Sequence, residues 1–218
     1  MPCAIRMQLY EENNSCTNKG RGEGKVRVRE GFVIARKFGL NWKETMKILK
    51  QVAAALVHFH DNGTSVYVDL KPENILIDRG KNAFLCDFGA VVKEGGNMPE
   101  TYTKEYSAPE VVEPHKNSKI TKKVDSYSFG IVVLQLIMQD AAILPIENGK
   151  NIVQKHIKDR AKDAAEFGRQ HAVCRRLLQD GCSKEEEIKI TDVALRCARG
   201  NPEARPSMKE IQRMLHEI

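Results

Sequence analysis

Two short polar segments carry the side chains of this chain that could perform chemistry. The first reads Tyr-Val-Asp-Leu-Lys-Pro-Glu-Asn over residues 67–74, and the second, Asp-Phe-Gly at 87–89, begins thirteen residues after Asn74. An aspartate five residues before an asparagine predicts a tight loop in which a carboxylate accepts a proton while an amide oxygen turns to a metal ion. The second aspartate adds another oxygen ligand, and Mg²⁺ prefers such ligands while leaving positions for phosphate oxygens. The pattern therefore predicts transfer of a phosphoryl group from a metal-bound nucleotide to a hydroxyl group.

These segments resemble the catalytic motifs of the protein kinase family. The family's catalytic loop reads His-Arg-Asp-Leu-Lys-Pro-Glu-Asn, from which this chain differs only at Tyr67 and Val68. Three further motifs follow in the family's order: Ala-Pro-Glu at 108–110, Asp-Ser-Tyr-Ser-Phe-Gly at 125–130 and Arg-Pro-Ser-Met at 205–208. Five motifs in the family's order and spacing argue against a chance match. The resemblance also implies an ion pair between Glu110 and Arg205.

The resemblance implies a role for each polar residue of these segments. Asp69 is the base that orients and deprotonates the acceptor hydroxyl, and Lys71 reaches the transferring phosphate. Asn74 and Asp87 are the Mg²⁺ ligands, and Thr103 helps to hold Asp69 and Lys71. A lysine at this position is similar to serine/threonine kinases rather than tyrosine kinases. Each side chain alone could be a loop cap, a surface charge or a turn residue, but their joint spacing favours the catalytic interpretation.

The front of the chain is expected to help bind ATP. Residues 5–11 alternate apolar and polar side chains like a short strand. This segment resembles the last small-lobe strand running into the hinge between the lobes, with Met7 guarding the adenine pocket. The backbones of Gln8 and Tyr10 would then face adenine, and Leu76 would lie under the ring. An arbitrary edge strand explains residues 5–11 equally well.

Two residues of the catalytic loop depart from the family pattern. Tyr67 replaces a histidine that stacks on the phenylalanine of Asp-Phe-Gly, but a tyrosine ring is also flat and can pack on Phe88. Val68 replaces an arginine that binds a phosphorylated activation loop, and valine cannot pair with phosphate. Activation through that pocket is therefore not expected.

The motifs of a kinase small lobe are not found in the sequence. Only 66 residues precede Tyr67, and no Gly-x-Gly-x-x-Gly-x-Val occurs. Lys37 resembles the lysine of that lobe only superficially and is interpreted as a solvated charge. We expect a hinge strand at 1–12, a flexible insertion at 13–30 and a kinase large lobe at 31–218. The insertion is basic but lacks interleaved aromatic residues, which favours a solvated loop over a nucleic-acid-binding one.

The expected fold is mainly α-helical, of the α+β type: a kinase-like large lobe with short β-hairpins at the catalytic site and a truncated small lobe. Apolar runs at 75–77 and 84–86, split by Asp-Arg-Gly, predict one such hairpin. Apolar periodicity and capping residues predict helices over 42–60, capped by Asn41, and over 120–138, 152–179, 183–199 and 206–218.

Composition is typical of a globular domain, with 218 residues of which 41% are hydrophobic and 29% charged. A net charge of +6 mildly favours anionic partners such as nucleotide phosphates or acidic protein surfaces. The six cysteines lack metal-site spacing and are expected to be thiols rather than disulfides, which suits a cytoplasmic location. The longest apolar stretch, 129–138, is too short to span a bilayer, and no signal peptide is visible.

Two functions from different classes follow. The first is a serine/threonine protein kinase that transfers the γ-phosphate of ATP to protein hydroxyls with Mg²⁺, present as a truncated catalytic domain. The alternative is a non-catalytic kinase-like binding or scaffold module, favoured by the missing glycine loop and lysine–glutamate pair. The late helices, with Trp42 and the segment from Cys197 to Met208, resemble those of receptor-linked and interleukin-receptor-associated kinases.

Overall fold

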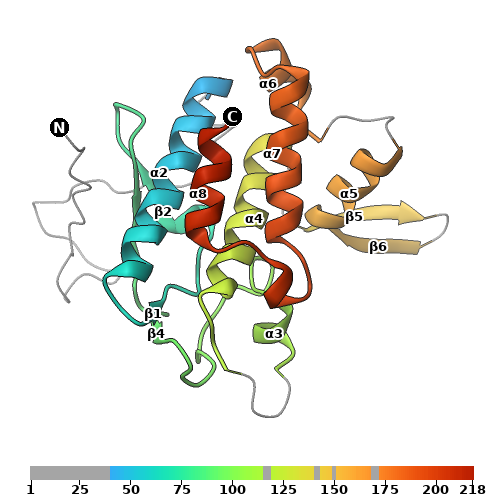
Figure 1. The fold of residues 1–218 in the computed structure, drawn as a ribbon. Helices are drawn as coiled ribbons and strands as arrows, with labels where there is room; N and C mark the ends of the chain where they lie inside the picture. Colours follow the sequence, from blue (N-terminus) through green and yellow to red (C-terminus); the bar gives the residue numbers. More distant parts are fainter. Residues whose placement is uncertain (1–39, 115–118, 140–142, 149–150, 168–171) are drawn as a thin grey trace, which may run out of the picture.

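The computed structural model describes residues 40–114, 119–139, 143–148, 151–167 and 172–218 (Figure 1). The expected hinge strand at 1–12, with Met7, Gln8 and Tyr10, and the expected insertion at 13–30 lie outside these residues, as does Lys37. Helices dominate the described part, and the strands there form three two-stranded antiparallel sheets. The expectation of a mostly helical kinase-like large lobe is confirmed.

The elements are short or medium in length, and η1 and η2 are single turns of 3-10 helix. In chain order they are α2 (Trp42–Asp61), β1 (Ser65–Val66), η1 (Pro72–Asn74), β2 (Ile75–Ile77), β3 (Ala83–Leu85), β4 (Val92–Lys93), α3 (Pro109–Val112), α4 (Lys123–Met138), β5 (Ile143–Asn148), β6 (Asn151–His156), α5 (Ile157–Phe167), α6 (Arg175–Gln179), α7 (Lys184–Cys197), η2 (Pro202–Ala204) and α8 (Met208–His216).

Helix α2 begins at the predicted cap. The Asn41 side chain accepts a hydrogen bond from the backbone N–H of Glu44 at 2.9 Å, and the Glu44 carboxylate accepts one from the Asn41 N–H at 3.0 Å. This capping box satisfies two N–H groups that the helix itself cannot pair. The helix ends at Asp61, next to the predicted His60, where an Asn-Gly turn follows.

Helix α4 is the centre of the core. Thirteen of its 16 residues are buried, and Figure 1 shows it between α2 and α8 on one side and α7 on the other. A Cβ atom at Gly130 would lie 2.6 Å from Cβ of Cys197 and 2.8 Å from the carbonyl oxygen of Ala194. Glycine therefore allows α4 and α7 to approach this closely. The prediction of a buried helix within 120–138 is confirmed: it runs from Lys123 to Met138.

The predicted hairpin is present as β2 and β3, with Ile75 paired to Leu85. Helix α2 holds its far end, because Lys47 Nζ donates to the Gly80 carbonyl at 2.9 Å and the Gln51 side chain accepts from the Ala83 N–H at 2.9 Å. The segment at 67–74 leads directly into β2, and the Asp-Phe-Gly segment follows β3 after one residue. The paired strands therefore bring the two polar segments to the same end of the hairpin.

The single helix predicted over 152–179 is wrong. Strands β5 and β6 form a hairpin that places Asn148 opposite Asn151, and the helical structure begins only at Ile157, in α5 and then α6. The sequence contains a signal for this hairpin, Asn-Gly at 148–149 between runs rich in β-branched residues, which the helical interpretation passed over. In Figure 1 this hairpin and α5 lie at one edge of the molecule.

Two expectations about membranes and cysteines can be compared with the described residues. No helix in those ranges combines the length and apolar character needed to cross a bilayer. The four described cysteines form no disulfide, as expected: Cys86, Cys174, Cys182 and Cys197.

Candidate active site

The loop that precedes β2 is anchored by a buried carboxylate at the start of α4. Asp125 is fully buried, and its two oxygens accept hydrogen bonds from the backbone N–H groups of Tyr67 at 2.8 Å and Val68 at 2.7 Å. His60 Nε2 lies 2.8 Å from Asp125 Oδ2. Val68 has a φ of 72°, a conformation that β-branched residues rarely adopt. The bonds to Asp125 therefore hold the loop in a strained backbone shape.

Sequence analysis missed this anchor, although two signals for it are present. Asp125 stands in a helix whose other buried residues are mostly apolar, and a buried carboxylate requires hydrogen-bonding partners. His60 follows Leu56 by four residues and so continues the buried face of α2. A buried acid and a buried histidine on packed helices could have been paired on these grounds.

Asp69, Lys71 and Thr103 form a closed network on the front of the loop. Lys71 Nζ donates to Asp69 Oδ2 at 2.6 Å and to Thr103 Oγ1 at 2.8 Å. The Thr103 N–H donates to the other carboxylate oxygen of Asp69 at 3.1 Å. The expectation that Thr103 holds both residues is confirmed. The side chains of Asp69 and Lys71 remain 12% and 21% exposed, so part of each is in contact with solvent.

Asn74 is joined to Asp69 and, through the backbone, to the Asp-Phe-Gly segment. Its amide nitrogen donates to the Asp69 carbonyl at 2.8 Å and to Asp69 Oδ2 at 3.2 Å. Its own carbonyl accepts from the N–H of Cys86 at 2.9 Å, which places the residue before Asp87 against Asn74. Because the amide nitrogen points to Asp69, the amide oxygen of Asn74 is the atom left to meet a cation.

Asp87 is the most accessible of the predicted site residues that the structure describes. It is exposed and has a φ of 58°, and its Oδ1 accepts from the Gly89 N–H at 3.3 Å. Across the described ranges, no three His, Cys, Asp or Glu side chains gather in a way that could hold a metal ion. One carboxylate and one amide oxygen are hard donors that suit Mg²⁺ when phosphate and water complete the coordination. The donor set therefore fits this ion.

An aromatic cluster packs the loop at 67–74 against the Asp-Phe-Gly segment. The rings of Tyr67 and Phe88 meet edge to face with centroids 5.5 Å apart, and Phe59 contacts both rings. The expected packing of Tyr67 on Phe88 is confirmed. The Tyr67 hydroxyl donates to the carbonyl of Cys86, and burial raises its pKa above the ordinary range, so the phenol stays protonated.

The predicted adenine contacts are only partly described. Leu76 lies half-buried on β2 and is paired with Phe84, which is 41% exposed, so an apolar surface is available on this hairpin. The other predicted contacts, Gln8 and Tyr10, lie outside the described residues.

The segment after Asp-Phe-Gly is fixed at its end by the predicted ion pair. Glu110 and Arg205 form a bidentate ion pair, with N–O distances of 2.6 Å and 2.8 Å. The remaining N–H groups of Arg205 reach three backbone carbonyls, those of Arg199, Lys123 and Gly200. All five guanidinium donors are therefore satisfied, which a fully buried arginine side chain requires.

Comparison with known proteins agrees with this geometry. The sequence model of the protein kinase domain matches residues 26–216. The probable LRR receptor-like serine/threonine-protein kinase RPK1 of Arabidopsis thaliana is 32% identical over 205 residues, covering 87% of this chain and 36% of that protein. The probable serine/threonine-protein kinase PBL9 of the same plant is 32% identical over 195 residues, covering 82% and 44%.

A third relative carries a different description. The probable inactive receptor kinase At1g48480 of Arabidopsis thaliana is 30% identical over 184 residues, covering 82% of this chain and 27% of that protein. The chain thus spans less than half the length of each of these three relatives. Since the domain match covers most of the sequence, and the catalytic loop, the Asp-Phe-Gly segment and the Glu110–Arg205 pair occupy one folded unit, this chain belongs to the protein kinase domain family and is a distant homologue of plant receptor-like serine/threonine kinases.

Proposed function

We propose that this chain carries the catalytic half of a serine/threonine protein kinase, which transfers the γ-phosphate of ATP to a protein hydroxyl. The observation that carries the proposal is the network of Asp69, Lys71 and Thr103, in which a lysine bridges the catalytic carboxylate and a threonine of the activation segment. Two of the relatives are described as serine/threonine kinases, which supports the choice of acceptor.

In the proposed reaction, Asp69 accepts the proton of the substrate hydroxyl. The hydroxyl oxygen bonds to the γ-phosphorus, the bond from that phosphorus to the β–γ bridging oxygen breaks, and ADP leaves with the electron pair. The Thr103 N–H fixes one oxygen of Asp69, so the carboxylate is oriented before substrate arrives. The Lys71 ammonium lies 2.6 Å from Asp69 Oδ2, where it would stabilise negative charge on the transferring group.

The remaining site residues bind the nucleotide and its metal. Asn74 and Asp87 would hold Mg²⁺, which when bound neutralises charge on the phosphates. Leu76 would lie beneath adenine, and the backbones of Gln8 and Tyr10 would face its edge. The absence of disulfides among the described cysteines supports a cytoplasmic location.

A second candidate is a non-catalytic kinase-like module that binds nucleotide or a partner without transfer. It is favoured by the likeness to a probable inactive receptor kinase and by the strained valine at position 68 in place of the family's arginine. On this alternative, Asp69 and Lys71 would serve only to order the activation segment.

Radiolabelled phosphate transfer to a basic protein substrate tests the proposal. The 218-residue chain alone is expected to transfer little, because catalysis here is mostly positioning and the phosphates would lack the cover a small lobe gives. The same chain joined to the small lobe of an active relative is expected to phosphorylate serine or threonine. There, Asp69→Asn should lower the rate about 100-fold or more, as loss of a general base does.

Asp192→Asn on the exposed surface of α7 makes the same chemical change away from the site and should leave transfer intact. A joined chain that binds Mg-ATP but transfers nothing would establish the module alternative. Transfer that survives Asp69→Asn would remove the assigned role of Asp69.

A further inference from the structure

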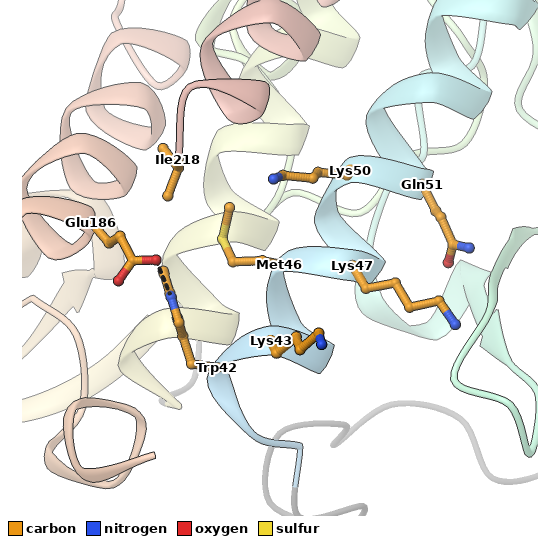
Figure 2. Close-up of a pocket in the computed structure, with 8 residues that line it drawn as sticks. All are labelled: Trp42, Lys43, Met46, Lys47, Lys50, Gln51, Glu186 and Ile218. Atoms are coloured by element: carbon orange, nitrogen blue, oxygen red, sulfur yellow. Dashed lines mark hydrogen bonds between the residues drawn. The ribbon is translucent and has the colours of Figure 1, made fainter. Parts of the chain in front are cut away.

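A surface groove of about 460 Å³ lies along the first half of α2, beside α7 and the C-terminal Ile218 (Figure 2). It shares no lining residue with the catalytic loop or the Asp-Phe-Gly segment. Its apolar floor is formed by Trp42 and Met46, which are only 5% and 6% exposed, and Ile218 closes one side. Its volume lies in the range of pockets that bind small ligands or peptide side chains.

The rim of this groove is basic. Lys43, Lys47 and Lys50 follow one another at helical spacing, so they share one face of α2 next to the apolar floor. Figure 2 shows all three side chains along this stretch of the helix. Lys47 Nζ is bonded to the Gly80 carbonyl at 2.9 Å, and it lies on the exposed surface together with Lys43.

Glu186, the acidic residue that lines the groove, already accepts hydrogen bonds at both of its carboxylate oxygens. Glu186 accepts a hydrogen bond from the Trp42 indole N–H at 3.0 Å and another from the Ser183 N–H at 2.7 Å. Burial acts to raise the pKa of Glu186, but the hydrogen bonds from Ser183 and Trp42 outweigh it and hold the pKa below its ordinary value. The described lining of the groove therefore carries three lysines and a single carboxylate, whose oxygens are already hydrogen-bonded.

We propose that this groove binds an acidic peptide segment of a partner protein. An apolar side chain of the peptide would enter over Trp42 and Met46, and flanking carboxylates would pair with Lys43 and Lys47. Charge complementarity favours an anionic occupant. The small apolar area favours a peptide over a membrane, because Trp42 and Met46 are only 5% and 6% exposed, which leaves room for one apolar side chain, whereas membrane binding needs several exposed apolar side chains.

The groove contains its own reporter, since Trp42 is the single tryptophan of the chain. The probe is a six-residue peptide with leucine and phenylalanine at its centre and two glutamates on each side, blocked at both ends. Titration into the full chain should give a saturable change in tryptophan emission, and affinity should fall as salt rises, because the rim pairs are screened. Isothermal titration calorimetry provides the same affinity without the fluorophore.

Charge reversal identifies the binding face. Lys43→Glu is expected to weaken binding about tenfold, and Lys43→Glu with Lys47→Glu more than that, since each change replaces an attraction with a repulsion. Lys162→Glu on α5 makes the same change in net charge at an exposed site and should leave the affinity unchanged. Thermal melting of each variant confirms that it is folded.

Several results would overturn the proposal. One is an equal loss of affinity in Lys43→Glu and Lys162→Glu, which would mean non-specific attraction to a basic protein. Another is equal binding of the peptide with lysines in place of glutamates. An emission change with anionic vesicles and none with the peptide would make a membrane the occupant. Concentration-dependent dimerisation abolished by Lys43→Glu, without peptide binding, would assign the groove to a second copy of the chain.

Discussion

Two groups of charged residues in this lobe differ in burial and in the kind of partner they have. The side chains of Asp125 and Arg205 are completely buried, and each is hydrogen-bonded to backbone groups as well as to one buried or partly buried side chain. Asp69 and Lys71 are partly exposed, and their bonds run mainly to each other and to Thr103. A substrate can replace such bonds without unfolding the chain, whereas the bonds of the buried group have no substitute.

The two groups meet in the backbone of one loop. The N–H groups of Tyr67 and Val68 bind Asp125, and the N–H of Asp69 returns to the Tyr67 carbonyl at 3.0 Å. The rear of the loop is therefore fixed to α4 while its front remains accessible. Stability is expected to depend on the buried group and chemistry on the exposed group, and substitutions can test that division.

The largest expected effect on stability is at Arg205. Arg205→Ala leaves the Glu110 carboxylate without its partner and three backbone carbonyls without donors, so the free energy of unfolding should fall by about 4 kcal/mol. Urea denaturation measures it. Arg196→Ala removes a half-exposed arginine paired with Asp192 and should cost less than about 1 kcal/mol. Similar losses in both variants would contradict the comparison.

Asp125, which anchors the loop from α4, and Asp69, which lies on the loop itself, provide a second comparison between the buried and the exposed group. Asp125→Ala removes the acceptor of two buried N–H groups and should lower the free energy of unfolding by about 3 kcal/mol. Asp69→Ala removes a carboxylate from the accessible face and should cost about 1 kcal/mol or less, while abolishing any phosphoryl transfer. A greater loss of stability in Asp69→Ala would show that the front of the loop is structural.

Sequence reasoning worked best where a local rule fixes the structure. Asn41 specifies the start of α2, and the short apolar runs at 75–77 and 84–86 predict the β2–β3 hairpin, whose second strand is shifted by one residue to 83–85. The assignment of Asp69, Lys71 and Thr103 to one network came from the family resemblance, since no local pattern predicts contact over 34 residues.

Sequence reasoning failed where two local signals competed, or where a residue's hydrogen-bond partner is distant in the sequence. Residues 151–156 could extend a helix by their polar spacing, but their pairing with β5 decided the outcome. The bond between His60 and Asp125 joins residues 65 apart, and only the packing of α2 against α4 brings them together. The bond from Trp42 to Glu186 depends in the same way on α2 and α7.

Tyr67 lies between the two groups, and Tyr67→Phe gives the smallest and most specific effect. The ring can keep its contact with Phe88, but the Cys86 carbonyl loses a donor, so the free energy of unfolding at pH 8 should fall by about 1 kcal/mol. Burial raises the pKa of Tyr67 above its ordinary value. The unfolded phenol therefore ionises first, and the stability that protonated Tyr67 contributes is present below about pH 10 and is lost as the pH rises further.

The phenylalanine variant lacks this ionisation, so the wild-type advantage should shrink by about 1.4 kcal/mol per pH unit above pH 10, reach zero before about pH 11 and then reverse in sign. Urea denaturation of both proteins at pH 8, 10 and 11 measures the difference, in which the other titrating groups cancel. Tyr102→Phe, which removes an exposed hydroxyl, is the matched control and should leave the free energy of unfolding at pH 8 close to that of the wild type. A wild-type advantage that stays constant up to pH 11 would mean that the Tyr67 hydroxyl is accessible to solvent. Tyr67 would then belong with the exposed group of Asp69 and Lys71 rather than with the buried group.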